Sequence, residues 1–256
     1  MNRSRGAGYI VAAALCPAIV YVLGRMAAPY IPDTVISLFL YAGALELLLI
    51  GVPAVLLMLR KREAYWGMLA CPASYPAGLV VLSSAAYVLA AVLVTAVWAA
   101  LLQRLGIHLP LEAGLPPATG AGELAAALLC AALIPAVCEE LLFRGVMLQY
   151  LERKAGKKWA VVICGIAFAS LHFSFHGFAA LAVIGLFLSA LTLKYRNLWL
   201  AVIFHFLYNA LVIVMQALGG MPSIQTVFLC AGVFAASLYL LFQRREVKNG
   251  TDGHRL

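Results

Sequence analysis

Residues 134–145 read IPAVCEELLFRG, a stretch that places three charged side chains inside an otherwise apolar segment. The flanking residues, from Glu123 to Leu148, are mainly alanine and leucine. About 20 mostly apolar residues are enough to span the hydrocarbon core of a bilayer as a helix. The stretch is therefore predicted to lie in a transmembrane helix that carries ionisable groups at membrane depth.

Similar apolar segments recur along the whole chain. Of its 256 residues, 65% are apolar and 11% are charged, whereas soluble domains contain roughly half and a quarter. The other predicted spans are Gly8–Leu23, Val35–Leu59, Leu79–Leu102, Trp159–Phe173, Phe178–Leu193, Leu198–Leu218 and Val227–Phe242. We predict an all-α, polytopic membrane protein, a bundle of about eight transmembrane helices forming a single integral membrane domain, residues 1–256, with a polar cytoplasmic tail at residues 244–256.

The positions of the basic residues predict how the bundle is oriented. If the N-terminus lies in the cytoplasm, 15 of the 18 Lys and Arg residues fall on the cytoplasmic side, and Arg25 and Arg104 fall on the other. Basic loops are retained in the cytoplasm. We therefore expect a multi-pass protein integral to the cell membrane with both termini cytoplasmic. The net charge of +8 is spread over several loops, so it indicates membrane orientation and no nucleic-acid partner.

The charged residues of the 134–145 stretch are functional candidates, because one charge at the bilayer centre costs about 2.5 to 3.5 kcal/mol. Glu140 and Arg144 are four residues apart, which places them on one helical face within reach of a salt bridge. Glu139 points about 100° away from Glu140 and is free to face a different cavity. Pro135 predicts a kink just upstream, which would open room near Glu139.

Two later spans carry further polar residues. The fifth span ends with Phe168 and His172, and the seventh contains His205 and Asn209, again four residues apart on one face. Counted from the predicted span ends, Glu139, His172 and His205 lie at depths of roughly 17, 21 and 12 Å. A carboxylate that deprotonates water, imidazoles that orient it or hold a metal, and an amide that donates to an oxyanion are the groups that a peptide hydrolase needs.

These three patterns together resemble the motifs of a known family. They are E-E-x-x-x-R at residues 139–144, F-x-x-x-H at 168–172 and H-x-x-x-N at 205–209, and they are similar to those of the CPBP family, also called Abi, of CAAX proteases and bacteriocin-processing enzymes. The resemblance covers residues 123–218. It implies a catalytic core there, within an eight-helix architecture.

The resemblance also implies an activity: an intramembrane endopeptidase, a glutamate-dependent CAAX endopeptidase, that hydrolyses a peptide bond in a prenylated (CAAX-type) or other membrane-associated peptide. Glu139 would act with His172 to activate water, and His205 and Asn209 would stabilise the oxyanion. The implied supporting residues are Glu140, Arg144 and Phe168. The implied partners are the lipid bilayer and a lipidated or membrane-embedded peptide.

Several alternatives remain open on the sequence. Glu139, His172 and His205 could ligate a divalent metal such as zinc, as in a metalloprotease, although the sequence has no HExxH helix. Otherwise no cofactor is needed. A different function is that of a non-catalytic membrane immunity or scaffold protein that binds a peptide or partner through the same cavity. A transporter is less favoured, because no internal repeat is evident. Glu46, in the second span, matches no motif and is expected to bond across helices or to line an access path.

Overall fold

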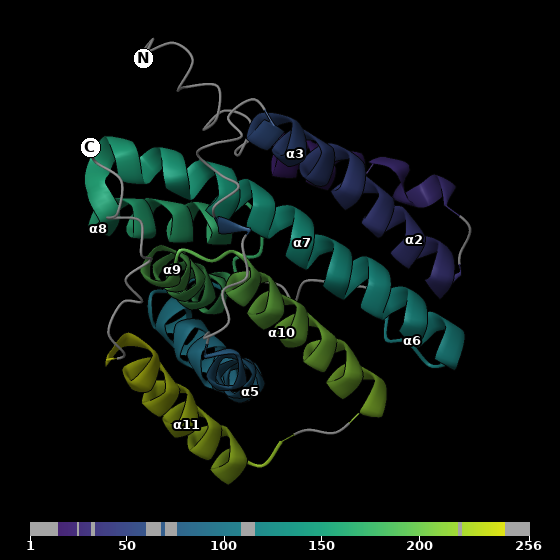
Figure 1. The fold of residues 1–256 in the computed structure, drawn as a ribbon. Coiled ribbons are helices and arrows are strands. Elements are labelled where there is room, and N and C mark those ends of the chain that lie inside the picture. Colours follow the sequence, from purple (N-terminus) through teal and green to yellow (C-terminus); the bar gives the residue numbers. More distant parts are fainter. Residues whose placement is uncertain are drawn as a thin grey trace.

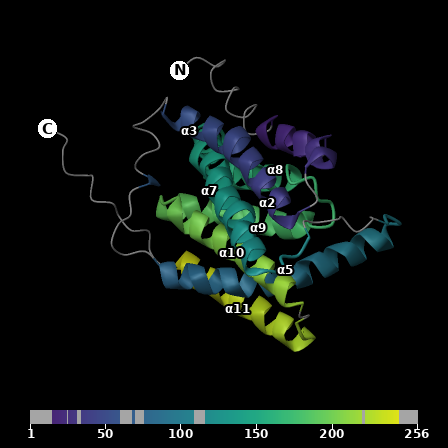
Figure 2. The same ribbon diagram turned by 90° about the vertical axis from the view of Figure 1, so that its right-hand side faces the viewer.

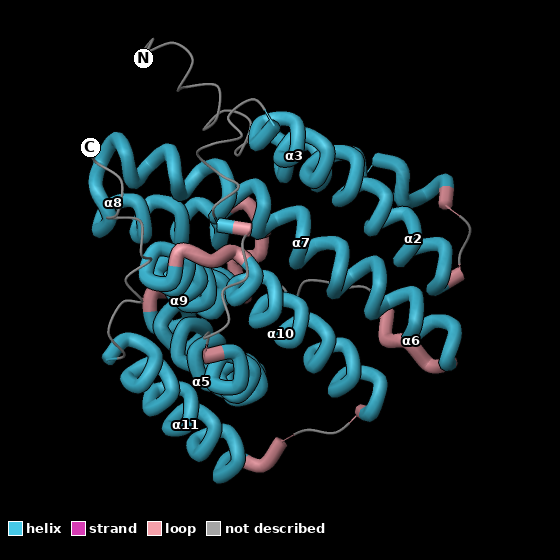
Figure 3. The backbone as a smooth tube through the Cα atoms, in the orientation of Figure 1, coloured by secondary structure: helices cyan, strands magenta, loops and turns pink. Residues whose placement is uncertain are grey.

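The structure is a computed structural model, and it describes residues 15–24, 26–31, 34–59, 68–69, 76–108, 116–219 and 222–243. Within these ranges every regular element is a helix and none is a strand, which confirms the predicted all-α fold class. Short loops at residues 171–177 and 196–198 join three of the longer helices (Figure 3). The predicted tail, residues 244–256, lies outside the described residues.

Six helical segments of the described chain are long and apolar enough to cross a membrane. They are Val35–Leu59, Ala77–Arg104, Ala121–Ser170, Phe178–Tyr195, Trp199–Leu218 and Ile224–Gln243, and a shorter apolar helix, Leu15–Gly24, precedes them. Each overlaps a span predicted from the sequence, so the chain is a multi-pass membrane protein. The number of eight spans and the cytoplasmic position of both termini stay predictions.

Some of these segments are made of several helices in direct succession (Figure 1). After Leu15–Gly24, the helices in chain order are η1 (Ala28–Tyr30), α2 (Val35–Glu46), η2 (Leu47–Gly51), α3 (Val52–Leu59), α5 (Ala77–Arg104), α6 (Ala121–Ala127), η4 (Leu128–Leu133), α7 (Ile134–Glu140), η5 (Leu141–Met147), α8 (Leu148–Ser170), α9 (Phe178–Tyr195), α10 (Trp199–Leu218) and α11 (Ile224–Gln243). The run from α6 to α8 contains the 134–145 stretch, and the run from α2 to α3 contains Glu46.

The longest helical segment turns back on itself at Gly156. The φ of 79° and ψ of 166° at this residue lie outside the helical region and are adopted at low cost by glycine alone. The two arms of the segment then lie side by side (Figure 1), and Cys164 Sγ donates to the carbonyl of Phe143 over 3.4 Å. The predicted spans Glu123–Leu148 and Trp159–Phe173 are therefore two arms joined at one bent residue rather than by a loop.

Two prolines shape the helices that carry the acidic residues. Upstream of Pro135, where the sequence predicts a kink, the structure has the wider π-helical turn η4, and the Ile134 N–H bonds to the carbonyl five residues earlier. Pro53 follows the π-helical turn η2 in the same way, and Val52 also bonds five residues back. Proline lacks the N–H group and displaces the carbonyl four residues before it, so the helix widens there.

Small residues let these two segments approach each other closely. A Cβ added at Gly43 would lie 2.8 Å from the Cβ of Cys130, and one at Gly51 would lie 2.6 Å from Cys138 Sγ. The same sequence spacing separates the two glycines and the two cysteines, so α2–α3 runs parallel to η4–α7. Such close packing matters in lipid, where no hydrophobic effect drives helices together.

The remaining helices complete one bundle. The largest hydrophobic core contains residues of α3, α5, α8, α9, α10 and α11. Helices α5 and α11 lie side by side (Figure 2), and Ser83 Oγ bonds to Ser237 Oγ between them over 2.8 Å. Tyr87 Oη donates to the Ala180 carbonyl over 2.5 Å and ties α5 to α9. Most of the described helices thus share one core, while Phe39 of α2 and Ala127 of α6 belong to a second, smaller cluster. The single integral membrane domain of residues 1–256 stays a prediction.

Candidate active site

Glu139 and Glu140 face different surroundings, although they are neighbours on α7. Glu139 is 8% exposed and lines a cavity, whereas Glu140 is fully buried. Successive residues of a helix point about 100° apart, which is the divergence that the sequence predicts. Glu139 is therefore the carboxyl group that a ligand can reach, and Glu140 belongs to the interior.

Glu140 is the centre of a buried polar network. Arg144 Nη1 donates to Glu140 Oε1 over 2.7 Å, which confirms the predicted salt bridge. Arg144 Nη2 donates to the carbonyl of Gly185 on α9 over 3.2 Å, and His205 Nδ1 on α10 lies 2.9 Å from the same Glu140 oxygen. One buried carboxylate with its cation thereby links three transmembrane segments through charge-assisted hydrogen bonds.

Phe168 packs against the cationic and imidazole groups of the site. The guanidinium carbon of Arg144 lies 4.3 Å from the centroid of the Phe168 ring. The ring centroids of His172 and His205 lie 4.5 and 5.7 Å from the same centroid. A desolvated cation over an aromatic face is stabilised by about 2 kcal/mol. Phe168, itself fully buried, thus fixes the positions of three polar side chains relative to one another.

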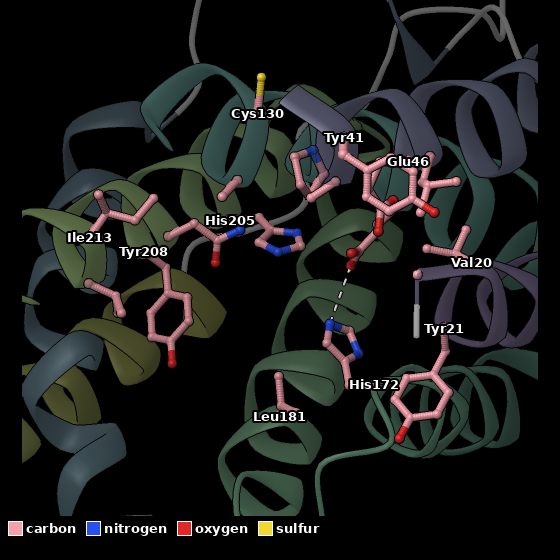
Figure 4. A pocket seen from close by; sticks show the side chains of 18 of the residues that line it. Val20, Tyr21, Tyr41, Glu46, Cys130, His172, Leu181, His205, Tyr208 and Ile213 are labelled. Carbon is pink, nitrogen blue, oxygen red and sulfur yellow. Dashed lines mark ion pairs between the residues drawn. The ribbon is translucent and has the colours of Figure 1, made fainter. Parts of the chain in front are cut away.

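His172 lies in a turn rather than in the predicted fifth span. Helix α8 ends at Ser170, and Phe173 adopts a positive φ of 52° that no α-helix continues through. His172 Nδ1 lies 2.7 Å from the carbonyl oxygen of Phe168, and because a carbonyl only accepts, Nδ1 carries a proton. His172 Nε2 then faces Glu139 Oε2 at 3.5 Å (Figure 4). That separation is longer than an ordinary hydrogen bond, so the two groups face each other without a direct one.

A cavity of about 560 Å³ adjoins these groups. Its polar lining residues are Tyr21, Tyr41, Glu46, Glu139, His172, His205, Tyr208 and Asn209. Figure 4 shows the labelled side chains of Glu46, His172 and His205 around this space. The rest of the wall is largely aliphatic. A polar site of few groups within an apolar pocket of several hundred Å³ is the usual form of a small-molecule or peptide side-chain site.

The structure thus brings the four predicted catalytic residues to one cavity. Glu139 comes from α7, His172 from the turn after α8, and His205 and Asn209 from successive turns of α10. Glu140 and Arg144 lie behind them in the interior. The roles predicted for these residues stay predictions.

The three residues that the sequence left open as metal ligands do not form a metal site. His205 pairs through Nδ1 with Glu140, whereas Glu139 and His172 face each other. Across the described ranges, no three His, Cys, Asp or Glu side chains are grouped as ligands. Zinc sites in proteins use at least three protein ligands. The expected set of Glu139, His172 and His205 therefore does not fit a bound divalent metal in this arrangement.

Three features of the site are not specified by the residues that the motifs fix. The carbonyl of Gly185 accepts from Arg144, and a backbone acceptor has no signature in the sequence. Tyr208 lines the cavity, and its ring centroid lies 5.6 Å from that of Tyr87. Its position between His205 and Asn209 in the sequence of α10 could have indicated that it lies near the site. Glu46 had a clear signal, an acid in an apolar span, but no motif assigned it a role.

Comparison with known proteins supports the reading of the motifs. Residues 121–211 match the family described as Type II CAAX prenyl endopeptidase Rce1-like. The matched segment contains all three motifs and covers less than half of the chain. The match confirms the resemblance to CPBP-type membrane peptidases in this segment. No curated protein and no solved structure matches the chain.

Proposed function

We propose that this protein is an intramembrane endopeptidase that hydrolyses a peptide bond in a prenylated, CAAX-type substrate or another membrane-associated peptide. The observation that carries the proposal is the approach of Glu139 Oε2 to His172 Nε2 at 3.5 Å on the wall of the large cavity. Both residues lie in the segment that matches a peptidase family.

Glu139 and His172 are arranged to polarise one water molecule. With Nδ1 donating to the Phe168 carbonyl, His172 Nε2 is an acceptor, and the Glu139 carboxylate is an acceptor as well. A water molecule beside the pair, within hydrogen-bond reach of both acceptors, donates one hydrogen bond to each and directs its oxygen lone pair outward. As that oxygen bonds to the scissile carbonyl carbon, Glu139 takes the proton, and it later transfers the proton to the leaving amide nitrogen.

His205 and Asn209 are the groups proposed to stabilise the oxyanion. They lie one helical turn apart on α10 and line the same cavity as Glu139. His205 Nδ1 is held by Glu140, so its Nε2 is the ring atom left for a ligand, and Asn209 contributes an amide donor. Loss of a single oxyanion donor costs about 10²- to 10³-fold in kcat.

The apolar walls of the cavity suit a substrate that is held by the membrane. The aliphatic lining residues include Ile31, Leu38, Leu45, Leu181, Ile184, Val212 and Ile213. A prenyl chain or an apolar side chain would lose its contact with lipid there without meeting water. The volume of about 560 Å³ lies within the range of roughly 300 to 1,000 Å³ that ligand pockets span.

We further infer that one end of the bundle faces the cytoplasm. Arg196 pairs with Glu152 at 2.6 Å, which places the turn between α9 and α10 beside the bend of α8. The residues around that bend include Arg153, Lys154, Lys157 and Lys158. Basic residues concentrate on the cytoplasmic side. Cytoplasmic termini and residence in the cell membrane follow as part of this proposal.

The test is cleavage of a farnesylated, internally quenched CAAX-type peptide by the purified full chain in proteoliposomes. The Glu139→Gln variant keeps the shape of the side chain and removes the base, so we expect kcat/KM to fall by at least about 100-fold. Glu123→Gln, at the exposed start of α6 where Glu123 accepts from the Thr119 N–H, is the matched control and should keep wild-type activity. A Glu139→Gln enzyme with wild-type kcat/KM would refute the mechanism.

A further inference from the structure

A second, smaller cavity of about 190 Å³ adjoins the first. The residues that line both cavities are Val20, Tyr21, Glu46, Glu139 and His172. The other lining residues of the smaller cavity are Pro17, Ile50, Phe143, Leu171 and Phe173, all of them apolar. Its ionisable groups are thus Glu46, Glu139, His172 and the phenol of Tyr21. Figure 4 shows Glu46 and His172 facing this shared region.

Two carboxyl oxygens at the junction of the cavities are buried without a hydrogen-bond partner in the described chain. One is Glu46 Oε2 and the other is Glu139 Oε2, which has the 3.5 Å approach of His172. A buried polar atom left unsatisfied costs about 1 to 3 kcal/mol. A water site needs 2 to 4 polar partners and about 30 Å³ of space, and the smaller cavity offers both.

The packing of the helices fixes Glu46 in this position. Glu46 is the last residue of α2, directly before the π-helical turn η2. On either side of it, Gly43 and Gly51 allow close contact with Cys130 and Cys138, so α2 is held against the segment that carries the catalytic motif. An acid at this depth is costly. Of the two sequence expectations for Glu46, a bond across helices leaves its Oε2 unexplained, whereas the place of Glu46 on both cavity walls is consistent with lining an access path.

We propose that the smaller cavity is a water-binding compartment and that Glu46 is the residue that retains water in it. The inference rests on the proposed function: Glu139 and His172 line both cavities, so water held in the smaller one reaches the catalytic pair without crossing the apolar substrate pocket. Glu46 binds the stored water and acts on the peptide bond through Glu139, which makes it a positioning residue. It lies outside the segment, residues 121–211, that matches the peptidase family.

Hydroxyl-radical footprinting of the full chain by radiolysis tests for the water directly. Phe143 is 1% exposed but lines the smaller cavity, so water there should oxidise it in the wild-type protein, whereas the fully buried Leu188 should stay unmodified. Glu46→Leu should abolish the oxidation of Phe143, and Glu46→Gln, which keeps a polar group, should preserve it. Equal oxidation of Phe143 and Leu188 in the wild type would overturn the proposal.

Kinetics with the farnesylated quenched peptide test the role of the compartment. Glu46→Leu should lower kcat by about tenfold or more with little change in KM, because the peptide still binds but the smaller cavity no longer retains water for Glu139 and His172. Glu46→Gln should restore most of the rate. Gln216→Leu, a polar-to-apolar change at an exposed position of α10, is the control. If Glu46→Leu does not fold, Ile50→Phe fills the smaller cavity from its apolar wall and should reduce both Phe143 oxidation and kcat.

The outcomes separate this inference from the proposed function. Wild-type kcat in Glu46→Leu or Ile50→Phe, beside an inactive Glu139→Gln, would overturn the water compartment and leave the peptidase proposal intact. An active Glu139→Gln would overturn the peptidase proposal, while the oxidation of Phe143 would still decide whether the cavity holds water.

Discussion

Replacing Arg144 by Met removes the cation from a fully buried network. The guanidinium donates to Glu140 Oε1 over 2.7 Å and to the Gly185 carbonyl over 3.2 Å, and it lies 4.3 Å from the centroid of Phe168. Methionine fills much of the same space but satisfies none of these groups. Removing one partner of a buried ion pair costs about 3 to 5 kcal/mol, because the other charge stays buried without compensation. We expect the free energy of unfolding of Arg144→Met to fall by that amount.

The double variant Glu140→Gln/Arg144→Met tests whether the unpaired charge of Glu140 causes the loss of stability in Arg144→Met. Removing both charges should return part of the lost stability, with a coupling energy of about 0.5 to 3 kcal/mol in a double-mutant cycle. The measurement is unfolding in mixed micelles with increasing SDS, followed by tryptophan fluorescence. A Glu140→Gln single variant completes the cycle. Arg144→Met within about 0.5 kcal/mol of the wild type, or a double variant no more stable than Arg144→Met, would refute the reasoning.

Two further substitutions probe the contacts that position the network. Gly185→Ala would place a Cβ 2.6 Å from the carbonyl oxygen of Gly165, where backbone faces backbone, so the free energy of unfolding should fall by about 1 to 3 kcal/mol. Gly232→Ala meets nothing within 4 Å and should stay within about 0.5 kcal/mol, and equal effects at the two sites would contradict the packing argument. Tyr87→Phe removes the bond to the Ala180 carbonyl and should cost about 0.5 to 1.5 kcal/mol in the same SDS unfolding assay, whereas an unchanged stability would mean that the bond contributes nothing.

The helices were predictable because lipid imposes a strict rule on the sequence. Backbone groups in a bilayer must be satisfied within the segment, so apolar length alone locates a helix. The predicted segment Val35–Leu59 matches the observed run from α2 to α3, and the spans corresponding to α5, α9, α10 and α11 differ by up to three residues at their ends. The predicted spans Glu123–Leu148 and Trp159–Phe173, in contrast, belong to one helical segment, Ala121–Ser170. The end of α8 was harder to place, because the left-handed backbone of Phe173 follows from no residue preference.

The site was predictable where it depends on spacing within one helix. The separation of Glu140 from Arg144 and the divergence of Glu139 both follow from the helical repeat. Contacts between helices did not follow. The sequence grouped His205 with Glu139 and His172, and all three line one cavity, but it did not indicate that His205 Nδ1 also contacts Glu140. That contact depends on the rotation of α10 against α7, which is set by the packing of the whole bundle.

The two adjacent glutamates show why a hydrolytic site inside a membrane needs more than its catalytic groups. Helices in lipid are held by close packing and polar links rather than by the hydrophobic effect. Glu140 makes such polar links to Arg144 and His205. The link to His205 helps to position α10, and with it Asn209, which lies on the same helix and lines the cavity. Glu139 stays free of these polar links, and in the described part of the chain each glutamate keeps one buried oxygen, Oε2, without a hydrogen bond. An unsatisfied carboxylate at this depth is stable only while the rest of the network holds its helix in place, so the reactive group and the structural network depend on each other.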